Sequence, residues 1–186
     1  MYIVIEGVDG AGKTTIAKEI ERISPFRYWK HLNGPEHKGV NKLVPGLNDA
    51  AEEFVTARLL REFGTFDSIV QDRGFWSANV YWNIKGVRGT EPEATEHYWK
   101  ECLPEKTLYV LLTRPIDDCR RERFSWDKLR EIEAAFNFYY KECPLREWGS
   151  QTLNLPAKTV IGNGGAEPEF VAKKILGVAY AAAAGM

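Results

Sequence analysis

The chain has 186 residues, and 25 lysines and arginines stand against 26 aspartates and glutamates, for a net charge of −1. This balance gives no electrostatic reason to expect a nucleic-acid or membrane partner, and no apolar run is long enough to span a bilayer. A chain of this length most simply forms one domain, so we expect a single domain over residues 1–186. Three scattered cysteines and a start that leads straight into a strand predict a cytoplasmic protein.

The first predicted element is a short apolar strand over 2–5, followed by the glycine-rich stretch 7–15. This stretch matches the phosphate-binding loop pattern G-x-x-x-x-G-K-[ST] in the strand-to-helix setting that the pattern requires. Its glycines let successive N–H groups turn into one concavity, next to the positive end of the helix expected from Lys13. We predict that Lys13 binds the outer phosphates of a nucleotide and that the Thr14 hydroxyl binds Mg²⁺. The predicted nucleotide-binding residues are Gly7, Asp9, Gly10, Ala11, Gly12, Lys13, Thr14 and Thr15.

Extended and helical patterns alternate along the rest of the chain. Strands are predicted over 2–5, 26–32, 68–71, 107–113 and 159–161. Helices are predicted over 13–23, 48–63, 77–84, 116–123, 128–142 and from 167–169 onward. This alternation predicts an α/β fold in which a five-stranded parallel sheet is flanked by helices on both faces. Ligands bind such sheets at the carboxyl ends of the strands. The stretches found at those ends are 7–14, 33–35, Asp72, Arg73 and Arg114.

Two other classes of nucleotide-binding protein fit the sequence less well. A GTP-binding switch needs an N-K-x-D segment, but the Asn41-Lys42 pair continues as Leu-Val. A motor ATPase normally has a strand that ends in Asp-Glu, whereas the strand at 68–71 leads into Asp72 and Arg73. An arginine at this position favours an anionic acceptor over a water molecule.

Three stretches of the chain resemble the thymidylate kinases, a family of P-loop nucleoside monophosphate kinases. Residues 3–15 are similar to the family's opening, an apolar strand followed by E-G-x-D/E-G-A-G-K-T-T. Residues 54–58, Phe-Val-Thr-Ala-Arg, are similar to its F-A-A-D-R, and residues 72–73 with Ser77 and Tyr81 are similar to its D-R-Y-x-x-S-x-x-A-Y. The resemblance is strongest over the first twenty residues and only architectural after residue 84.

The resemblance implies a P-loop kinase that uses ATP and Mg²⁺ to phosphorylate a deoxynucleoside monophosphate, with dTMP as the leading acceptor. It implies that Asp9 accepts a hydrogen bond from the 3′-hydroxyl of the acceptor sugar and that Phe54 stacks on the base. Tyr81 is expected to crowd the 2′ position, and Ser77 belongs to the same substrate-binding set.

The resemblance also implies that Arg58 and Arg73 clamp the acceptor phosphate and that Asp72 assists the magnesium ion through water. Every one of these roles has a structural alternative. Phe54 and Tyr81 can pack in the core, Arg58 can be a solvated helix-end cation, and Asp72 and Arg73 can form a surface pair.

The variable positions of the phosphate-binding loop contain no basic residue, so the resemblance implies that a lid after the fourth strand supplies one. We expect a short lid near 114–127, with Arg123 as the first choice and Arg120 as the second. The alternative is a solvated helix face on which these arginines pair with Asp117, Asp118 and Glu122. The predicted catalytic residues are Lys13, Arg73, Asp9 and Arg123.

Two departures leave the acceptor base the least determined part of the interpretation. Gly74 stands where the family usually has tyrosine, and Ala78 stands where an asparagine often reads the base. Two other functions therefore stay open: a deoxynucleoside kinase of similar fold, and a non-catalytic regulatory protein that binds nucleotides. The expected partners are small nucleotides, and the resemblance alone implies a homodimer that pairs through helices on one face of the sheet.

Overall fold

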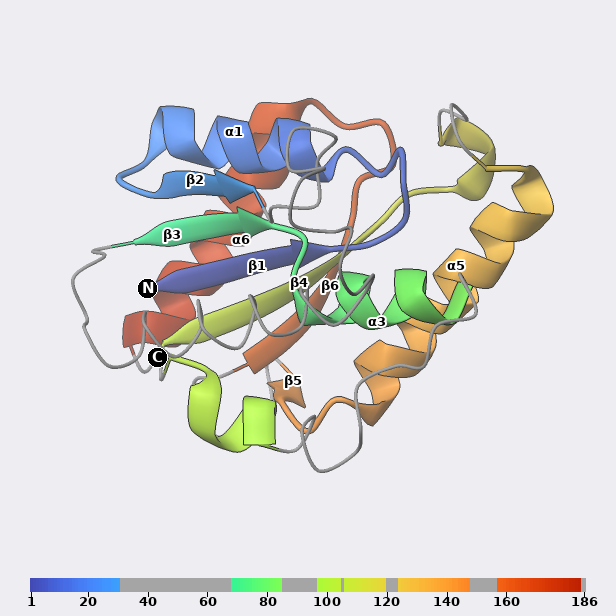
Figure 1. The fold of residues 1–186 in the computed structure, drawn as a ribbon. Helices are drawn as coiled ribbons and strands as arrows, with labels where there is room; N and C mark the ends of the chain where they lie inside the picture. Colours follow the sequence, from blue (N-terminus) through green and yellow to red (C-terminus); the bar gives the residue numbers. More distant parts are fainter. Residues whose placement is uncertain (31–67, 85–96, 105, 120–123, 148–156, 185–186) are drawn as a thin grey trace, which may run out of the picture.

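The computed structural model describes residues 1–30, 68–84, 97–104, 106–119, 124–147 and 157–184. They form a parallel sheet with helices on both faces (Figure 1). The order of the strands across the sheet is β2-β3-β1-β4-β6-β5, and every pair of neighbours is parallel. The strands are β1 Tyr2–Glu6, β2 Arg27–Lys30, β3 Ile69–Asp72, β4 Thr107–Thr113, the two-residue β5 Arg146–Glu147 and β6 Ala157–Gly162.

Four α-helices cover the described sheet, two on each face. Helices α1 and α6 pack against each other on one face, and α3 and α5 pack against each other on the opposite face (Figure 1). Among the described helices, none combines the length and the apolar character that crossing a bilayer requires. The helices are α1 Lys13–Ile23, α3 Phe75–Ile84, α5 Trp126–Glu142 and α6 Pro168–Ala184, with a π-helical turn at Tyr98–Cys102 and a 3₁₀ turn at Ile116–Asp118.

The core consists of two layers, one on each face of the sheet. Side chains along a strand alternate between the faces, so Tyr2 and Val4 of β1 enter the layer under α3 and α5, whereas Ile3 and Ile5 enter the layer under α1 and α6. Strand β4 is buried along its length except at Thr113, as its uncharged sequence predicts for a central strand. The carboxyl ends of β1, β3 and β4 therefore meet at one edge of a rigid platform.

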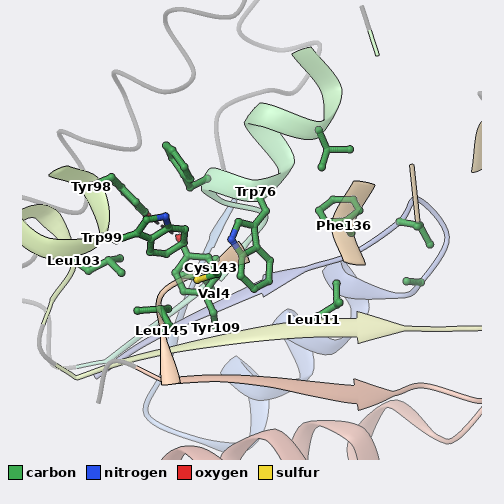
Figure 2. Packing of buried hydrophobic residues seen from close by; sticks show 14 of the residues in the cluster. Val4, Trp76, Tyr98, Trp99, Leu103, Tyr109, Leu111, Phe136, Cys143 and Leu145 are labelled. Atoms are coloured by element: carbon green, nitrogen blue, oxygen red, sulfur yellow. Dashed lines mark hydrogen bonds between the residues drawn. The ribbon is translucent and has the colours of Figure 1, made fainter. Parts of the chain in front are cut away.

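A cluster of aromatic side chains fixes α3 to the sheet (Figure 2). The rings of Trp76 and Tyr109 are 5.0 Å apart between centroids, and those of Trp99 and Tyr109 are 5.2 Å apart. The hydroxyls of Tyr98 and Tyr109 lie 2.6 Å apart and share a hydrogen bond. Because Trp76 is in the second position of α3 and fully buried, this cluster anchors the start of the helix directly after the end of β3.

Most of the predicted elements in the described part of the chain are confirmed. The helix predicted over 116–123 is wrong over 116–119, the part of it that the structure describes. Residues Ile116–Asp118 make a single 3₁₀ turn, and Cys119 then has an extended backbone with φ −76° and ψ 124°. The Cys119 side chain is buried, and its thiol donates to the carbonyl of Pro115 at 3.6 Å. Residues 120–123 lie outside the described residues.

Two helices begin two residues before their predicted starts because side chains cap them. Helix α5 begins at Trp126, where the Ser125 hydroxyl accepts a hydrogen bond from the Lys128 N–H at 3.3 Å. Helix α3 begins at Phe75 rather than at residue 77, because a buried carboxylate from β1 binds the N–H groups of its first turn. The two-residue strand β5 and the π-helical turn have no pattern in the sequence that predicts them.

Lys158 of β6 caps the carboxyl end of α5 from inside the protein. The residue is 5% exposed, and its Nζ donates to the carbonyls of Tyr140 at 2.7 Å and Cys143 at 2.8 Å. We expect Lys158→Met to lower the free energy of unfolding by about 2–3 kcal/mol, because two buried carbonyls lose their donor. Urea denaturation measures this loss. The control Lys173→Met, at an exposed helix position, is expected to change stability by about 0.5 kcal/mol or less. If Lys158→Met were as stable as this control, Lys158 would have no capping role.

Candidate nucleotide-binding site

The loop between β1 and α1 is folded tightly onto the carboxyl ends of the central strands. Gly7 has a φ of +140°, and a Cβ at this position would collide with the carbonyl of Leu112 in β4. Gly12 has a φ of +90°, and a Cβ there would come within 2.8 Å of the Asn163 side-chain nitrogen. Only glycine permits both the backbone conformation and the close approach at these positions. The predicted phosphate-binding loop thus has the backbone that such a loop needs.

A cavity of about 460 Å³ opens over this loop. Its walls come from the loop and the start of α1, from the residue after β3, and from the segment after β4. Gly7 and Ala11 are buried in the loop and do not belong to the wall. The lining residues are Asp9, Gly10, Gly12, Lys13, Thr14, Thr15, Arg73, Arg114 and Asp118.

Lys13 is the most buried cation of the cavity, with 4% of its surface exposed. Its Nζ donates to the carbonyl of Val8 at 2.6 Å, within its own loop. Burial, and then the nearby charge of Arg73, lower the pKa of Lys13 to about 7, although Asp9 and other carboxylates act in the opposite direction. A polyanion in the cavity would supply the negative charge that keeps this ammonium group protonated.

The low pKa of Lys13 predicts a pH-dependent cost to stability. Between about pH 7 and pH 10.5 the unfolded chain keeps the proton on this lysine and the folded chain releases it, so stability rises with pH in this window. Between pH 7 and pH 9 we expect the wild type to gain on the order of 2 kcal/mol relative to Lys13→Met. Urea denaturation of both proteins at the two pH values measures the difference. Parallel pH profiles would show that Lys13 stays protonated in the folded state.

Asp72 forms a pair with Thr14, which lines the cavity, although Asp72 itself is not one of the lining residues. Asp72 ends β3 and is 2% exposed, and its Oδ2 accepts hydrogen bonds from the hydroxyls of Thr14 and, at 3.4 Å, Tyr28. The other carboxylate oxygen, Oδ1, is buried and has no hydrogen-bond partner among the described residues. Hydroxyl and carboxylate oxygens are the ligands that Mg²⁺ prefers. The pair therefore fits the predicted divalent cation, and the unpartnered oxygen is the observation that supports this fit.

Arg73 has an unusual backbone conformation directly after β3. Its φ of 73° lies in the left-handed region, which is rare outside glycine, and its N–H donates to the carbonyl of Ile5 at 2.9 Å. The guanidinium donates to the carboxylate of Asp9 and lies 5.0 Å from the centre of the Tyr81 ring. Strained backbone of this kind is typical of functional sites. The fold thus brings three of the predicted substrate-binding residues into contact with one another.

The protonation states of Asp9, Arg73 and Tyr81 depend on one another. Burial alone would raise the pKa of Asp9, but the cations Arg73 and Lys13 outweigh that effect and hold the pKa below its usual value. Burial raises the pKa of the Tyr81 hydroxyl to about 12, so that this group is neutral at physiological pH. At neutral pH the group thus contains an ionised carboxylate and a charged guanidinium beside a neutral phenol.

Ser77 has a structural partner instead of a place in the cavity wall. The side chain of Glu6 is fully buried, and its Oε1 accepts hydrogen bonds from the N–H groups of Gly74 at 2.9 Å and Ser77 at 3.1 Å. The Ser77 hydroxyl donates to Oε2 of the same carboxylate. The substrate-binding role predicted for Ser77 therefore has no support in the geometry, because its hydroxyl is turned toward β1.

Sequence reasoning missed Asn163, placed Arg114 at a strand end without giving it a role, and considered Asp118 only as a partner of the lid arginines. The side chain of Asn163 donates to the carbonyl of Ala11 at 2.7 Å, and its backbone N–H donates to the carbonyl of Thr113 at 2.7 Å. Asn163 thus ties the phosphate-binding loop to the ends of β4 and β6. Its position directly after a strand that ends at the same edge was the signal that could have identified it.

Three predicted site residues, Phe54, Arg58 and Arg123, lie outside the described residues, as does the alternative lid residue Arg120. The structure describes the predicted lid at 114–119 and 124–127 only.

No family model matches the chain, and no curated protein matches it in sequence. Solved structures match its fold over nearly the whole length. A YorR protein from Bacillus subtilis in complex with phosphorylated GDP is 14% identical with a TM-score of 0.72, covering 100% of this chain and 99% of that one. A thymidylate kinase from Candida albicans is 16% identical with a TM-score of 0.62, at 100% and 93% coverage.

A third similar structure is deoxyadenosine kinase from M. mycoides with dCMP and a flexible dCDP bound, which is 15% identical with a TM-score of 0.58, at 95% and 97% coverage. At such identities the likeness is evidence of the fold alone. The chain has the α/β fold of the P-loop nucleotide kinases, as predicted: a parallel sheet of five main strands, extended here by the short strand β5, with helices on both faces.

Proposed function

We propose that this protein is an ATP-dependent kinase that transfers the γ-phosphoryl group to a deoxynucleoside monophosphate, with dTMP as the leading acceptor. One observation supports it most: a single cavity joins the phosphate-binding loop, with its buried Lys13 and its Asp9, to Arg73 at the end of the neighbouring strand β3. Groups suited to a donor triphosphate and groups suited to a second anion thus line the same space.

The donor side of the cavity has the groups that a magnesium nucleotide needs. In this proposal Lys13 leaves its carbonyl partner in the loop and binds the phosphates, and the loop N–H groups and the α1 dipole add to the attraction. Thr14 and Asp72 would hold the magnesium ion, which supplies positive charge next to the transferred group. Asn163 holds the phosphate-binding loop in place through its hydrogen bond to the carbonyl of Ala11.

On the side proposed for the phosphoryl acceptor, a guanidinium and a carboxylate are held together by a hydrogen bond. The guanidinium of Arg73 offers two parallel N–H donors to a phosphate, and the carboxylate of Asp9 can accept a hydrogen bond from a sugar hydroxyl. The Tyr81 ring supports the guanidinium from one side. Phosphoryl transfer needs no nucleophilic side chain, because an oxygen of the acceptor phosphate attacks in line, so positioning and charge are what these residues provide.

The proposal also includes roles for residues that the structure does not describe. Phe54 stacks on the acceptor base, Arg58 shares the acceptor phosphate with Arg73, and Arg123 acts from the lid. Ser77 is left out, since its hydroxyl is bound to Glu6. The homodimer and the cytoplasmic location likewise remain predictions.

A deoxynucleoside kinase is the second candidate. The contact between Arg73 and Asp9 favours it, because an arginine already neutralised by a carboxylate attracts a second phosphate less strongly and can position a hydroxyl. The names of two similar structures, a thymidylate kinase and a deoxyadenosine kinase, correspond to the two candidates.

The test is ADP release from ATP and Mg²⁺ with dTMP, dUMP, dCMP, dGMP, dAMP, UMP or thymidine as the only acceptor. Turnover with dTMP and little with UMP or thymidine is expected. Turnover with thymidine alone would move the protein to the nucleoside kinases, turnover with every deoxynucleoside monophosphate would mean that the base is not selected, and no turnover would favour a non-catalytic nucleotide-binding protein.

A further inference from the structure

Arg114 is the first residue after β4 and belongs to the cavity wall. The carbonyl of Thr113, the residue before it, accepts a hydrogen bond from the Asn163 N–H at 2.7 Å, and Thr113 pairs with Gly162 in the sheet. The backbone of Arg114 is therefore attached to a central strand. The resemblance implies a cation of this kind on the lid at Arg123, which lies outside the described residues; Arg114 is a cation at the edge of the sheet.

The other two basic side chains of the cavity wall have partners within the protein. Lys13 donates to a carbonyl of its own loop, and Arg73 donates to Asp9. In contrast, Nε of Arg114 is buried and has no hydrogen-bond partner in the part of the chain that the structure describes. A buried donor without an acceptor is unfavourable, so a ligand that brings acceptor oxygens into the cavity would satisfy it.

The order of the strands places Arg114 opposite Arg73. Strand β3, which leads into Arg73, lies on one side of β1, and β4, which leads into Arg114, lies on the other. The phosphate-binding loop follows β1, between them. If Arg73 holds the acceptor, Arg114 approaches the loop from the side of the donor. The exposed carboxylate of Asp118 lies on the same wall, so a polyanion bound there needs a nearby cation to offset it.

We propose that Arg114 is a further catalytic residue of this site, whose guanidinium donates hydrogen bonds to phosphate oxygens of the donor nucleotide. The proposal rests on the kinase function proposed above. In the transfer, an acceptor oxygen forms a bond to the γ phosphorus while the bond from that phosphorus to the bridging oxygen breaks, and ADP leaves with the electron pair. Arg114 transfers no proton; it offsets the charge that develops on the leaving oxygens.

The test compares full-length Arg114→Met and Arg114→Lys with the matched control Arg130→Gln, whose side chain is 64% exposed on α5. With the best acceptor, we expect Arg114→Met to lower kcat by about 10²-fold and to change the acceptor KM by no more than about threefold. Lysine is expected to restore only part of kcat, since it lacks the planar fork of donors. Thermal melting shows that each variant is folded, and if Arg114→Met is not, Arg114→Lys is compared with the control instead.

A kcat of Arg114→Met within about twofold of the wild type would overturn this inference and leave the kinase proposal standing, because the wild type still turns over. If the wild type turns over no acceptor, the kinase proposal fails. The role of Arg114 is then tested by the affinities of the two variants for ATP with Mg²⁺. Binding about tenfold weaker in Arg114→Met than in Arg130→Gln would support the phosphate contact, and equal affinities would overturn it.

Discussion

Replacing Lys13 by methionine is expected to lower turnover by about 10²–10³-fold while leaving the protein folded and, at neutral pH, at least as stable as the wild type. The loss follows from removing the cation at the centre of the phosphate-binding loop. The stability follows from the pKa of about 7, since the folded protein holds this buried lysine in its charged form only at a cost. Methionine has a similar length and brings no charge to bury.

Turnover is measured by coupled ADP release, and stability by urea denaturation at pH 7. Lys18→Met is the matched control, because Lys18 is an exposed lysine of the same helix and is not part of the cavity wall. The control is expected to keep activity within about twofold of the wild type. If Lys13→Met retained full activity, the phosphate role of this loop would be wrong. If it were active and also less stable than the wild type, Lys13 would be a structural residue.

The part of the site that the sequence predicts well is the part built from neighbouring residues. The loop, its glycines and the helix after it form one continuous stretch, so a local pattern is enough to place Lys13 and Thr14 in a common cavity. The central strand was predicted at its observed bounds, Thr107–Thr113, because burial on both faces leaves an uncharged run of residues.

The part that could not be predicted depends on which strands lie side by side. Glu6 and Ser77 are 71 residues apart in sequence, and Asn163 and Ala11 are 152 apart, yet each pair is joined by a hydrogen bond. These contacts follow from the positions of β3 and β4 on either side of β1, which no periodicity in the sequence specifies. The hydrogen bond from Ser77 to Glu6 could not be foreseen for the same reason, since its partner lies on another strand.

Replacing Glu6 by alanine is expected to lower the free energy of unfolding by about 3–5 kcal/mol, the second large effect that the structure predicts. The fully buried carboxylate accepts hydrogen bonds from two backbone N–H groups at the start of α3 and from the Ser77 hydroxyl. Alanine would leave these donors without partners in a space that excludes water. Because Arg73 directly precedes this turn and has a strained left-handed backbone, we also expect Arg73 to lose its position.

Glu6→Gln separates these effects, because its carbonyl oxygen can still accept from the two N–H groups and its amide can donate to the Ser77 hydroxyl. We expect Glu6→Gln to recover at least half of the stability that Glu6→Ala loses, about 2 kcal/mol, and Ser77→Ala to cost only about 1 kcal/mol. Urea denaturation gives all three values, and ADP release gives the activity of each variant. An alanine variant as stable as the wild type would mean that Glu6 does not organise the start of α3. A stable but inactive Glu6→Gln would instead show that activity depends on the charge of the carboxylate, beyond its role as a hydrogen-bond acceptor.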